Sequence, residues 1–209
     1  GQSYRFERFA MWLVSEMRGG TWIRRNLGDP VFYNRQQVKW RNYEASYDAF
    51  ELEPVSRENS TYVLQEYFVP VNRIDSFVPR MARIFRQHEV NVINVSIRHA
   101  RQDKGSLLAW APGEVFSFVV YYKQETTLAE RKEVRTWTRE LVEASLIEGG
   151  SYYLPYQIHA TPEQFSRAYP NASRFFEIKK KLDPSNKFRN RLWDAYYKPQ
   201  NGESVITRQ

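Results

Sequence analysis

Hydrophobic residues recur every three or four positions along the first segment of the chain, from Tyr4 to Met17. That spacing places them on one face of an amphipathic helix, which Gly19-Gly20 is expected to end. The stretch from Trp22 to Phe32 is interrupted by Gly28-Asp29-Pro30, so a loop is expected there. Apolar and polar residues then alternate from Val38 to Glu44, and this predicts a strand.

The centre of the chain alternates regularly between strand and helix patterns. Strands are predicted over Thr61 to Val69, Val90 to His99, Val115 to Tyr122 and Ser151 to Pro155. One helix is predicted after Asn72, and a second runs from the capping box at Thr127 to Gly149-Gly150. The order strand, helix, strand, strand, helix, strand is that of the ferredoxin-like split unit. We therefore expect an α+β fold, in which both helices cover one face of an antiparallel sheet that the strand from Val38 to Tyr43 extends.

The last fifth of the chain predicts a C-terminal helical tail. Thr161-Pro162-Glu163-Gln164 combines an N-cap, a proline at the first helical position and a capping-box glutamine, and a second helix is expected from Ala172 to Leu182. The aromatic anchors of this segment are many for its length: Phe165, Phe175, Phe176, Phe188 and Trp193. We therefore expect the tail to pack on a domain that the chain lacks, rather than to close its own core.

These patterns divide the chain into four parts. Residues 1–35 form an N-terminal helix and loop, and residues 36–160 form the α+β domain. Residues 161–197 form the C-terminal helical segment, and residues 198–209 form a polar tail.

Composition limits the functions that are open to the chain. Of its 209 residues 42% are hydrophobic, yet no apolar run approaches the ~18 residues that a membrane helix requires. The first residues lack the layout of a signal peptide, so a cytoplasmic location is expected. The sequence contains no cysteine, which excludes disulfides and thiolate chemistry, and its three histidines are too far apart to suggest a histidine-rich metal centre.

The net charge of +7 is concentrated near the C-terminus. Residues 161–209 hold ten basic and five acidic residues, and so supply +5 of the total. Such a patch attracts nucleic acid, phosphate groups or an acidic protein surface. A solvated helix face is the simpler interpretation, because acidic and apolar residues are interspersed.

No complete active site is visible in the sequence. A G-x-S-x-G elbow, a glycine-rich phosphate loop and metal-ligand spacing are all missing. What stands out is an aromatic and cationic lining of the predicted sheet: Tyr67, Arg98, His99, Tyr121, Tyr122, Tyr152, Tyr153, Tyr156 and His159. One face of the sheet must cover the helices, and the other is open to a ligand or a second domain. An interdomain surface without chemistry is an equally good interpretation of these tyrosines.

The stretch from Gly149 to Tyr197 carries a more specific signal. It begins Gly-Gly-Ser-Tyr-Tyr-Leu-Pro-Tyr-Gln-Ile-His-Ala-Thr, and it ends with Asp183-Pro184 followed by Phe188, Asn190 and Trp193. This pattern resembles the C-terminal end of FAD-linked oxidases of the vanillyl-alcohol-oxidase type, most closely the aldonolactone and alditol oxidases. The strands around Tyr67-Phe68-Val69-Pro70 and Arg98 are similar to the substrate, or cap, domain of that family, so the resemblance covers most of the chain.

The resemblance implies a division of labour between two domains. In such enzymes a larger N-terminal domain binds FAD, and the cap domain lays its sheet over the isoalloxazine ring to form a pocket for an alcohol or sugar-like substrate. Nothing in this chain matches the FAD-binding domain. The resemblance therefore implies that this domain is the missing partner, that FAD is the cofactor, and that the isolated chain is inactive and binds little FAD.

The resemblance also implies substrate-binding residues. Arg98 takes the place of an arginine that faces the substrate in the sugar-oxidising relatives. Their acidic residue two positions earlier is Ser96 here, which departs from the family pattern. Tyr121 and Tyr67 fall among the residues that would line the substrate pocket.

The implied cofactor-binding residues are Tyr156, His159 and Asn190. A lysine that the family places near the flavin N1 edge corresponds to Tyr156, which donates a hydrogen bond but supplies no charge to reduced flavin. His159 or Arg98 can compensate for that missing charge. Arg98 and Tyr156 are thus the predicted catalytic pair.

Two other classes of function are compatible with the same pattern. A strand rich in aromatic residues (Phe116, Phe118, Tyr121 and Tyr122) within this element order is also the plan of an RNA-recognition module. The signature motif of that module is absent, so nucleic acid is the less favoured partner. A non-catalytic ferredoxin-like interaction domain is the third hypothesis.

Overall fold

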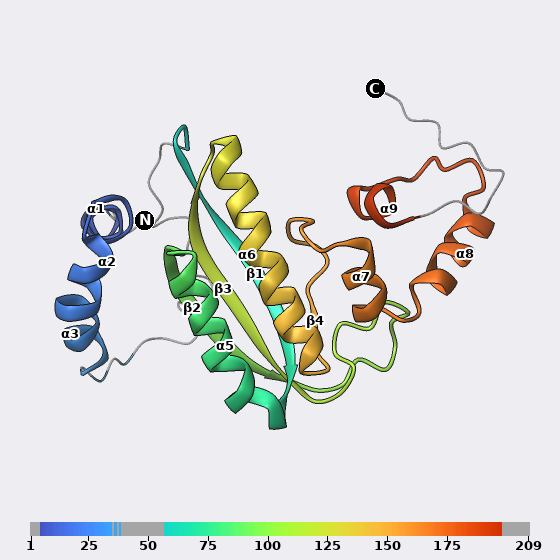
Figure 1. Cartoon of the computed structure of the whole chain (residues 1–209), viewed down its shortest axis with the longest axis horizontal. Coiled ribbons are helices and arrows are strands. Elements are labelled where there is room, and N and C mark those ends of the chain that lie inside the picture. The colour runs from blue at the N-terminus through green and yellow to red at the C-terminus, as the bar shows by residue number, and fades with distance from the viewer. Residues whose placement is uncertain (1–4, 35, 37, 39–56, 198–209) are drawn as a thin grey trace.

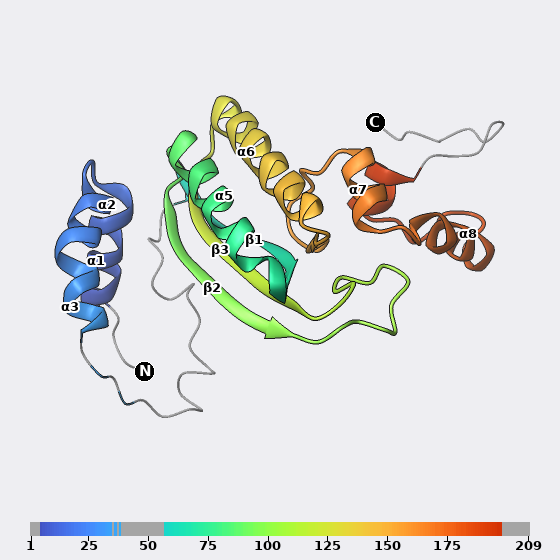
Figure 2. The ribbon, with the colours of Figure 1, turned by 60° about the horizontal axis from the view of Figure 1, so that its bottom comes forward.

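Four strands form one antiparallel sheet in the computed structural model, which describes residues 5–34, 36, 38 and 57–197 (Figure 1). The spatial order is β2-β3-β1-β4, with β1 at Ser60–Pro70, β2 at Val92–Ala100, β3 at Val115–Glu125 and β4 at Ser151–Tyr152. Helices α5 (Ile74–Gln87) and α6 (Leu128–Ile147) cover the same face of the sheet (Figure 2). This is the ferredoxin-like arrangement, so the predicted α+β fold is confirmed. Residues 39–43 of the strand predicted from Val38 to Tyr43 lie outside the described residues, as does the polar tail at 198–209.

The core lies between the sheet and these two helices. Tyr67 on β1 is paired with Phe118 on β3, and both point toward the helices with their neighbours two residues away. The largest buried members are Tyr67, Val69, Phe77, Phe118, Val120, Tyr122, Trp137 and Leu141. Burying one large apolar side chain contributes about 1.5–3 kcal/mol. This layer therefore holds α5 and α6 on the sheet.

The N-terminal segment is helical, with α1 (Arg5–Glu16), α2 (Gly20–Ile23), a π-helical turn (Arg24–Gly28) and α3 (Asp29–Tyr33). The predicted end of the first helix at Gly19-Gly20 is confirmed, and Gly19 has φ 83°. The loop predicted for Trp22 to Phe32 is wrong. Pro30 lies in the first turn of α3, where its missing N–H costs no hydrogen bond, and the π-helical turn accommodates the interruption.

The N-terminal helices lie on the side of the sheet opposite α5 and α6 (Figure 2). The Ser15 hydroxyl is 2.7 Å from the Tyr62 hydroxyl on β1, and Glu16 forms an ion pair of 2.6 Å with Lys123 on β3. Arg24 donates to the carbonyl oxygen of Ile93 at 2.7 Å, next to the β-bulge of β2. These contacts attach the N-terminal helices to one end of that face. At its other end Phe68 on β1 is 2% exposed and packs against Trp110 and Tyr153, while Arg98 on β2 stays exposed.

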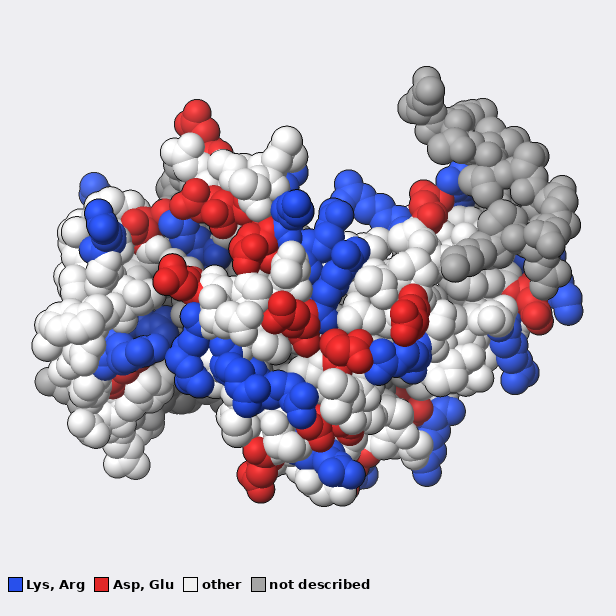
Figure 3. Space-filling model, viewed as in Figure 1, with Lys and Arg blue, Asp and Glu red and all other residues white. Residues whose placement is uncertain are grey.

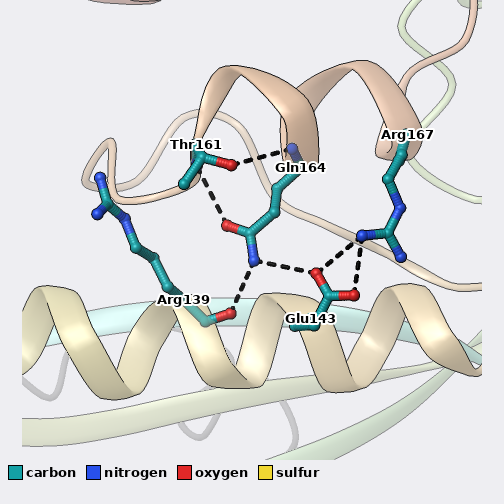
Figure 4. A network of polar contacts seen from close by, with 5 residues as sticks. All are labelled: Arg139, Glu143, Thr161, Gln164 and Arg167. Carbon is teal, nitrogen blue, oxygen red and sulfur yellow. Dashed lines mark hydrogen bonds and ion pairs between the residues drawn. The ribbon is translucent and has the colours of Figure 1, made fainter.

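Three short helices follow β4: α7 (Pro162–Ala168), α8 (Ala172–Leu182) and α9 (Arg191–Tyr196). The predicted capping box is present, because Thr161 and Gln164 exchange hydrogen bonds of 3.1 Å (Figure 4). The Gln164 amide also donates to the Arg139 carbonyl oxygen and to Glu143, which pairs with Arg167 at 2.8 Å. One glutamine thus caps α7 and fastens it to α6.

The anchors of this tail are buried within the chain itself. Phe165, Phe176 and Trp193 are 2%, 9% and 5% exposed and belong to the same core cluster as the sheet residues, whereas Phe188 is 78% exposed. The prediction that the tail reserves its aromatic anchors for a missing domain is therefore wrong for these three. The physical reason is that α7 packs on α6 and so extends the existing core. Part of the tail's positive charge is also neutralised locally, since Lys179 pairs with Asp183 at 2.6 Å.

His88, at the end of α5, joins that helix to α6 through two carboxylates. One ring nitrogen contacts Glu133, and the other lies 3.0 Å from Glu140. Burial lowers the pKa of His88, but the hydrogen bonds to Glu133 and Glu140 outweigh that effect and raise it above the usual 6.5. A pKa raised by folding stabilises the protein below the unfolded-state value, and this contribution disappears as pH rises through the folded-state value.

We expect His88→Gln to lower the free energy of unfolding more at about pH 5.5 than at about pH 9, because only the protonated imidazole gains from both carboxylates. Urea unfolding at the two pH values measures the difference. His99→Gln is the control, since the His99–Glu114 pair is exposed and screened by solvent. Equal losses for His88→Gln at both pH values would contradict the prediction.

Candidate functional site

The candidate site lies on the face of the sheet that is opposite to α5 and α6. Arg98 on β2 is paired with Ser117 on β3, which is paired with Phe68 on β1. Glu66, two residues before Phe68, points to this face, and its Oε1 accepts a hydrogen bond from the Ser117 hydroxyl. One strand separates Arg98 from Glu66, so their backbones are about 10 Å apart. A cation and a carboxylate therefore share one open surface.

Two tyrosines from the segment after β4 complete this surface. The backbone N–H of Tyr153 donates to the carbonyl oxygen of Glu66 at 2.9 Å, which carries the chain past the end of the short β4 pairing. The Tyr153 and Tyr156 rings are 5.2 Å apart between centroids. We call Glu66, Arg98, Ser117, Tyr153 and Tyr156 the open-face cluster.

The pKa of Tyr156 depends on other members of the open-face cluster. Burial raises the pKa of the Tyr156 phenol, Glu66 and Tyr153 raise it further, and Arg98 opposes them. The phenol therefore stays protonated at neutral pH and acts as a neutral hydrogen-bond donor. Glu66 and Arg98 both lie close enough to Tyr156 to act on its charge. The predicted pair Arg98 and Tyr156 is thus found on one face of the sheet.

A cleft of about 1140 Å³ opens beside the open-face cluster, at the edge of β1. β4 pairs only with Tyr67 and Phe68, so in the described part of the chain no strand covers β1 from Ser60 to Gln65 on that side. The cleft runs from this edge to α6 and α9, and its volume is slightly larger than the ~300–1,000 Å³ typical of small-molecule sites. Four of the six predicted site residues line it: Tyr121, Tyr156, His159 and Asn190.

His159 is buried in the wall of the cleft, 8% exposed. Its carbonyl oxygen accepts a hydrogen bond of 2.6 Å from Arg139, and its Nε2 lies 3.0 Å from the Gln157 amide oxygen. Within the described residues, Nδ1 is buried without a hydrogen-bond partner. Burial lowers the pKa of His159 to about 4, and Arg135 and Arg139 act in the same direction. His159 is therefore neutral at neutral pH and cannot replace the cation that Tyr156 lacks.

Asn190 has a structural task besides lining the cleft. Its side-chain oxygen accepts a hydrogen bond of 2.9 Å from the backbone N–H of Trp193 and so caps α9. Lys and Arg side chains gather in the hollow between α6 and α9 (Figure 3). The lining contributes Arg131, Arg135 and Arg191 to this positive region.

Tyr67 is not part of this surface. It lies on the helix-covered face of β1, is 1% exposed, and its pKa is raised well above the usual value by burial and by Tyr122. The prediction that Tyr67 lines a substrate pocket is therefore wrong. Successive side chains on a strand point to opposite faces of the sheet. Glu66 and Phe68 point away from the helices, so Tyr67 between them points toward the core.

The same alternation of side chains along a strand argues against the RNA-recognition hypothesis. Phe118 and Tyr122 are fully buried against α5 and α6, so they cannot stack on bases. Of the four β3 aromatics named for that hypothesis, Tyr121 alone points to the open face, where its ring lies 5.8 Å from that of Tyr62.

Sequence reasoning named Tyr153 in the aromatic lining of the sheet but did not group it with Glu66 and Ser117. The available signal was the carboxylate of Glu66 within an otherwise mostly apolar strand. A single carboxylate on a strand is most often a surface residue, and only the register with β3 shows which residues it faces.

No protein-family model and no curated protein matches the chain. No helix in the described part of the chain is both long and apolar enough to cross a membrane. Over residues 5–34 and 57–197, no three His, Asp or Glu side chains are grouped as a metal site would require. The fold and site thus define the chain as a ferredoxin-like α+β domain with a polar open face and an adjoining cleft.

Proposed function

We propose that the chain is the substrate, or cap, domain of an FAD-linked oxidoreductase that oxidises an alcohol or sugar-like substrate. The proposal rests on one observation: Arg98, Tyr156 and Glu66 share the open face of the sheet. In enzymes of the resembling family this face of the cap covers the flavin. The main binding site for FAD would come from a domain that has no counterpart in the chain.

Arg98, Glu66 and Ser117 of the open-face cluster each have a role in the binding and deprotonation of the substrate in this proposal. Arg98 is exposed and would hold an oxygen atom of the substrate through charge-assisted hydrogen bonds. Glu66 is half-buried and would accept the proton that leaves the substrate hydroxyl, while the Ser117 hydroxyl orients its carboxylate. The carboxylate that the family carries at the position of Ser96 is thus replaced from another strand, since Ser96 and Glu66 both pair with Val119.

The residues present fit the edge of a flavin ring. Tyr62, Tyr121 and Tyr156 all line the cleft, and the neutral phenol of Tyr156 would supply a hydrogen-bond donor. FAD, when bound, would accept the hydride from the substrate carbon. Tyr156 would donate a hydrogen bond toward the flavin, and the open sheet face would exclude water from one side.

In the complete product of the gene that encodes this chain, we expect bound flavin and a strong effect of Arg98→Ala. Loss of a hydrogen bond to a charged group costs about 1.5–3 kcal/mol, so kcat/KM should fall roughly 10- to 100-fold while the flavin content stays unchanged. A panel of alditols, aldonolactones and simple alcohols supplies the substrate, with bleaching of the flavin absorbance as the readout. Tyr156→Phe should shift the reduction potential of the flavin.

Arg83→Ala is the matched control, because Arg83 is exposed on α5, on the covered side of the sheet. A gene product that purifies without flavin would overturn the proposal. So would an Arg98→Ala variant as active as the Arg83→Ala control.

A further inference from the structure

Three arginines line the end of the cleft between α6 and α9, and among the described residues none of them has a carboxylate partner. Arg131 and Arg135 are four residues apart on α6 and so project from the same side of that helix, and Arg191 is the first residue of α9. In the described part of the chain none of the three forms an ion pair, and the cleft lining contains neither Asp nor Glu. Nearby Arg167 and Arg189 are, in contrast, paired with Glu143 and Asp194.

The buried ring of His159 lies in the same wall. Its pKa of about 4 reflects burial first and then the positive charges of Arg135 and Arg139. Nδ1 is buried and unpartnered among the described residues, while Nε2 is engaged with Gln157. If Nε2 carries the proton and donates to Gln157, Nδ1 carries the lone pair of the neutral ring.

The walls around these groups are held in place by other contacts. Arg139 donates to the His159 carbonyl oxygen at 2.6 Å, and the Tyr196 hydroxyl donates to the Ala160 carbonyl oxygen at 3.1 Å. Asn190 caps α9 and so positions Arg191. Arg131, Arg135 and Arg191 are all exposed, and no Asp or Glu lines the cleft beside them, so an anion in the cleft would meet positive charge that no lining carboxylate neutralises.

We propose that this end of the cleft binds the phosphate group of a small phosphate monoester. Guanidinium groups bind phosphate oxygens in paired hydrogen bonds, and three of them match a dianion better than a single carboxylate. The cleft is larger than a phosphate requires and continues toward Tyr121 and Tyr156, which leaves room for the organic part of the ligand.

This site does not depend on the proposed flavin chemistry, because it is tested by binding to the chain as it stands. Isothermal titration with inorganic phosphate and with glucose 6-phosphate should give saturable binding at constant ionic strength. Arg131→Gln combined with Arg135→Gln should weaken both affinities at least about tenfold, since each lost charged hydrogen bond costs about 1.5–3 kcal/mol. The ring signals of His159 should shift on titration in the wild-type chain and stay in place in this double variant.

The matched control is Arg83→Gln with Arg86→Gln, which removes the same charge from exposed positions on α5. It should leave both affinities unchanged, and circular dichroism should show both double variants folded. Absence of phosphate binding, or an equal loss in the control, would overturn the proposal. Tighter binding of gluconate, or of a single-stranded oligonucleotide, would overturn the assignment to a phosphate monoester.

Discussion

Replacing Gly150 by alanine is expected to lower the free energy of unfolding by about 3 kcal/mol or more, because there is no space for the added methyl group. A Cβ at this position would lie 2.1 Å from the carbonyl oxygen of Phe68 and 2.7 Å from the hydroxyl oxygen of Ser145. Both neighbours are buried, and Gly150 precedes β4 directly. The methyl group can be accommodated only if β4 moves away from β1, which would also move Tyr153 and Tyr156.

Urea unfolding of the purified variant measures this loss. Gly113→Ala is the control, since a Cβ at Gly113 meets nothing within 4 Å, and it should change the stability by less than about 0.5 kcal/mol. Equal stabilities of the two variants would show that the segment before β4 is not packed as described.

Phe165→Ala is expected to cost about 3–5 kcal/mol, as is typical of a large aromatic side chain removed from a core. The Phe165 ring is 2% exposed, stacks on Tyr196 with 4.1 Å between centroids, and lies 5.6 Å from Tyr169. Because α7 shares its core with α6, the loss should appear in one cooperative transition of the whole domain.

Phe188→Ala, at a side chain that is 78% exposed, is the matched control and should have little effect on stability. Following both tryptophan fluorescence and far-UV circular dichroism tests the cooperativity. If the tail unfolded in a separate transition at lower urea concentration, its packing on the chain's own core would be refuted.

Much of the fold could be predicted because its signals are local. Alternating residues predicted the strands, and the capping box at Thr161 predicted the start of α7 to the residue. The same local reasoning failed at Trp22 to Phe32, where Gly28-Asp29-Pro30 is a typical break. In the sequence alone, a proline in the first turn of a helix cannot be told apart from a proline in a loop. Only the structure shows that a π-helical turn precedes Pro30 and that the helix continues.

The candidate site was predictable only in part. Arg98 and Tyr156 were found through the resemblance, and they do share one face. Tyr67 was assigned to the wrong face because alternation within a strand does not say which set of side chains faces the helices when both sets are aromatic. The Glu66 carboxylate depends on the register between β1 and β3, which no local pattern reveals.

By itself, the sequence determined the order of the four strands and of the two helices that alternate with them, the start of α7 and the absence of cysteine chemistry. These follow from the residue types and from contacts a few positions apart along the chain. The tertiary structure alone decided which face each strand residue occupies, where the tail packs and which arginines lack carboxylates. Those properties depend on contacts between distant segments, such as the short pairing of β4 with β1 that leaves the cleft open. For each of these properties a segment could contact many other segments of the chain, and only the packing of the whole chain selects one set of contacts.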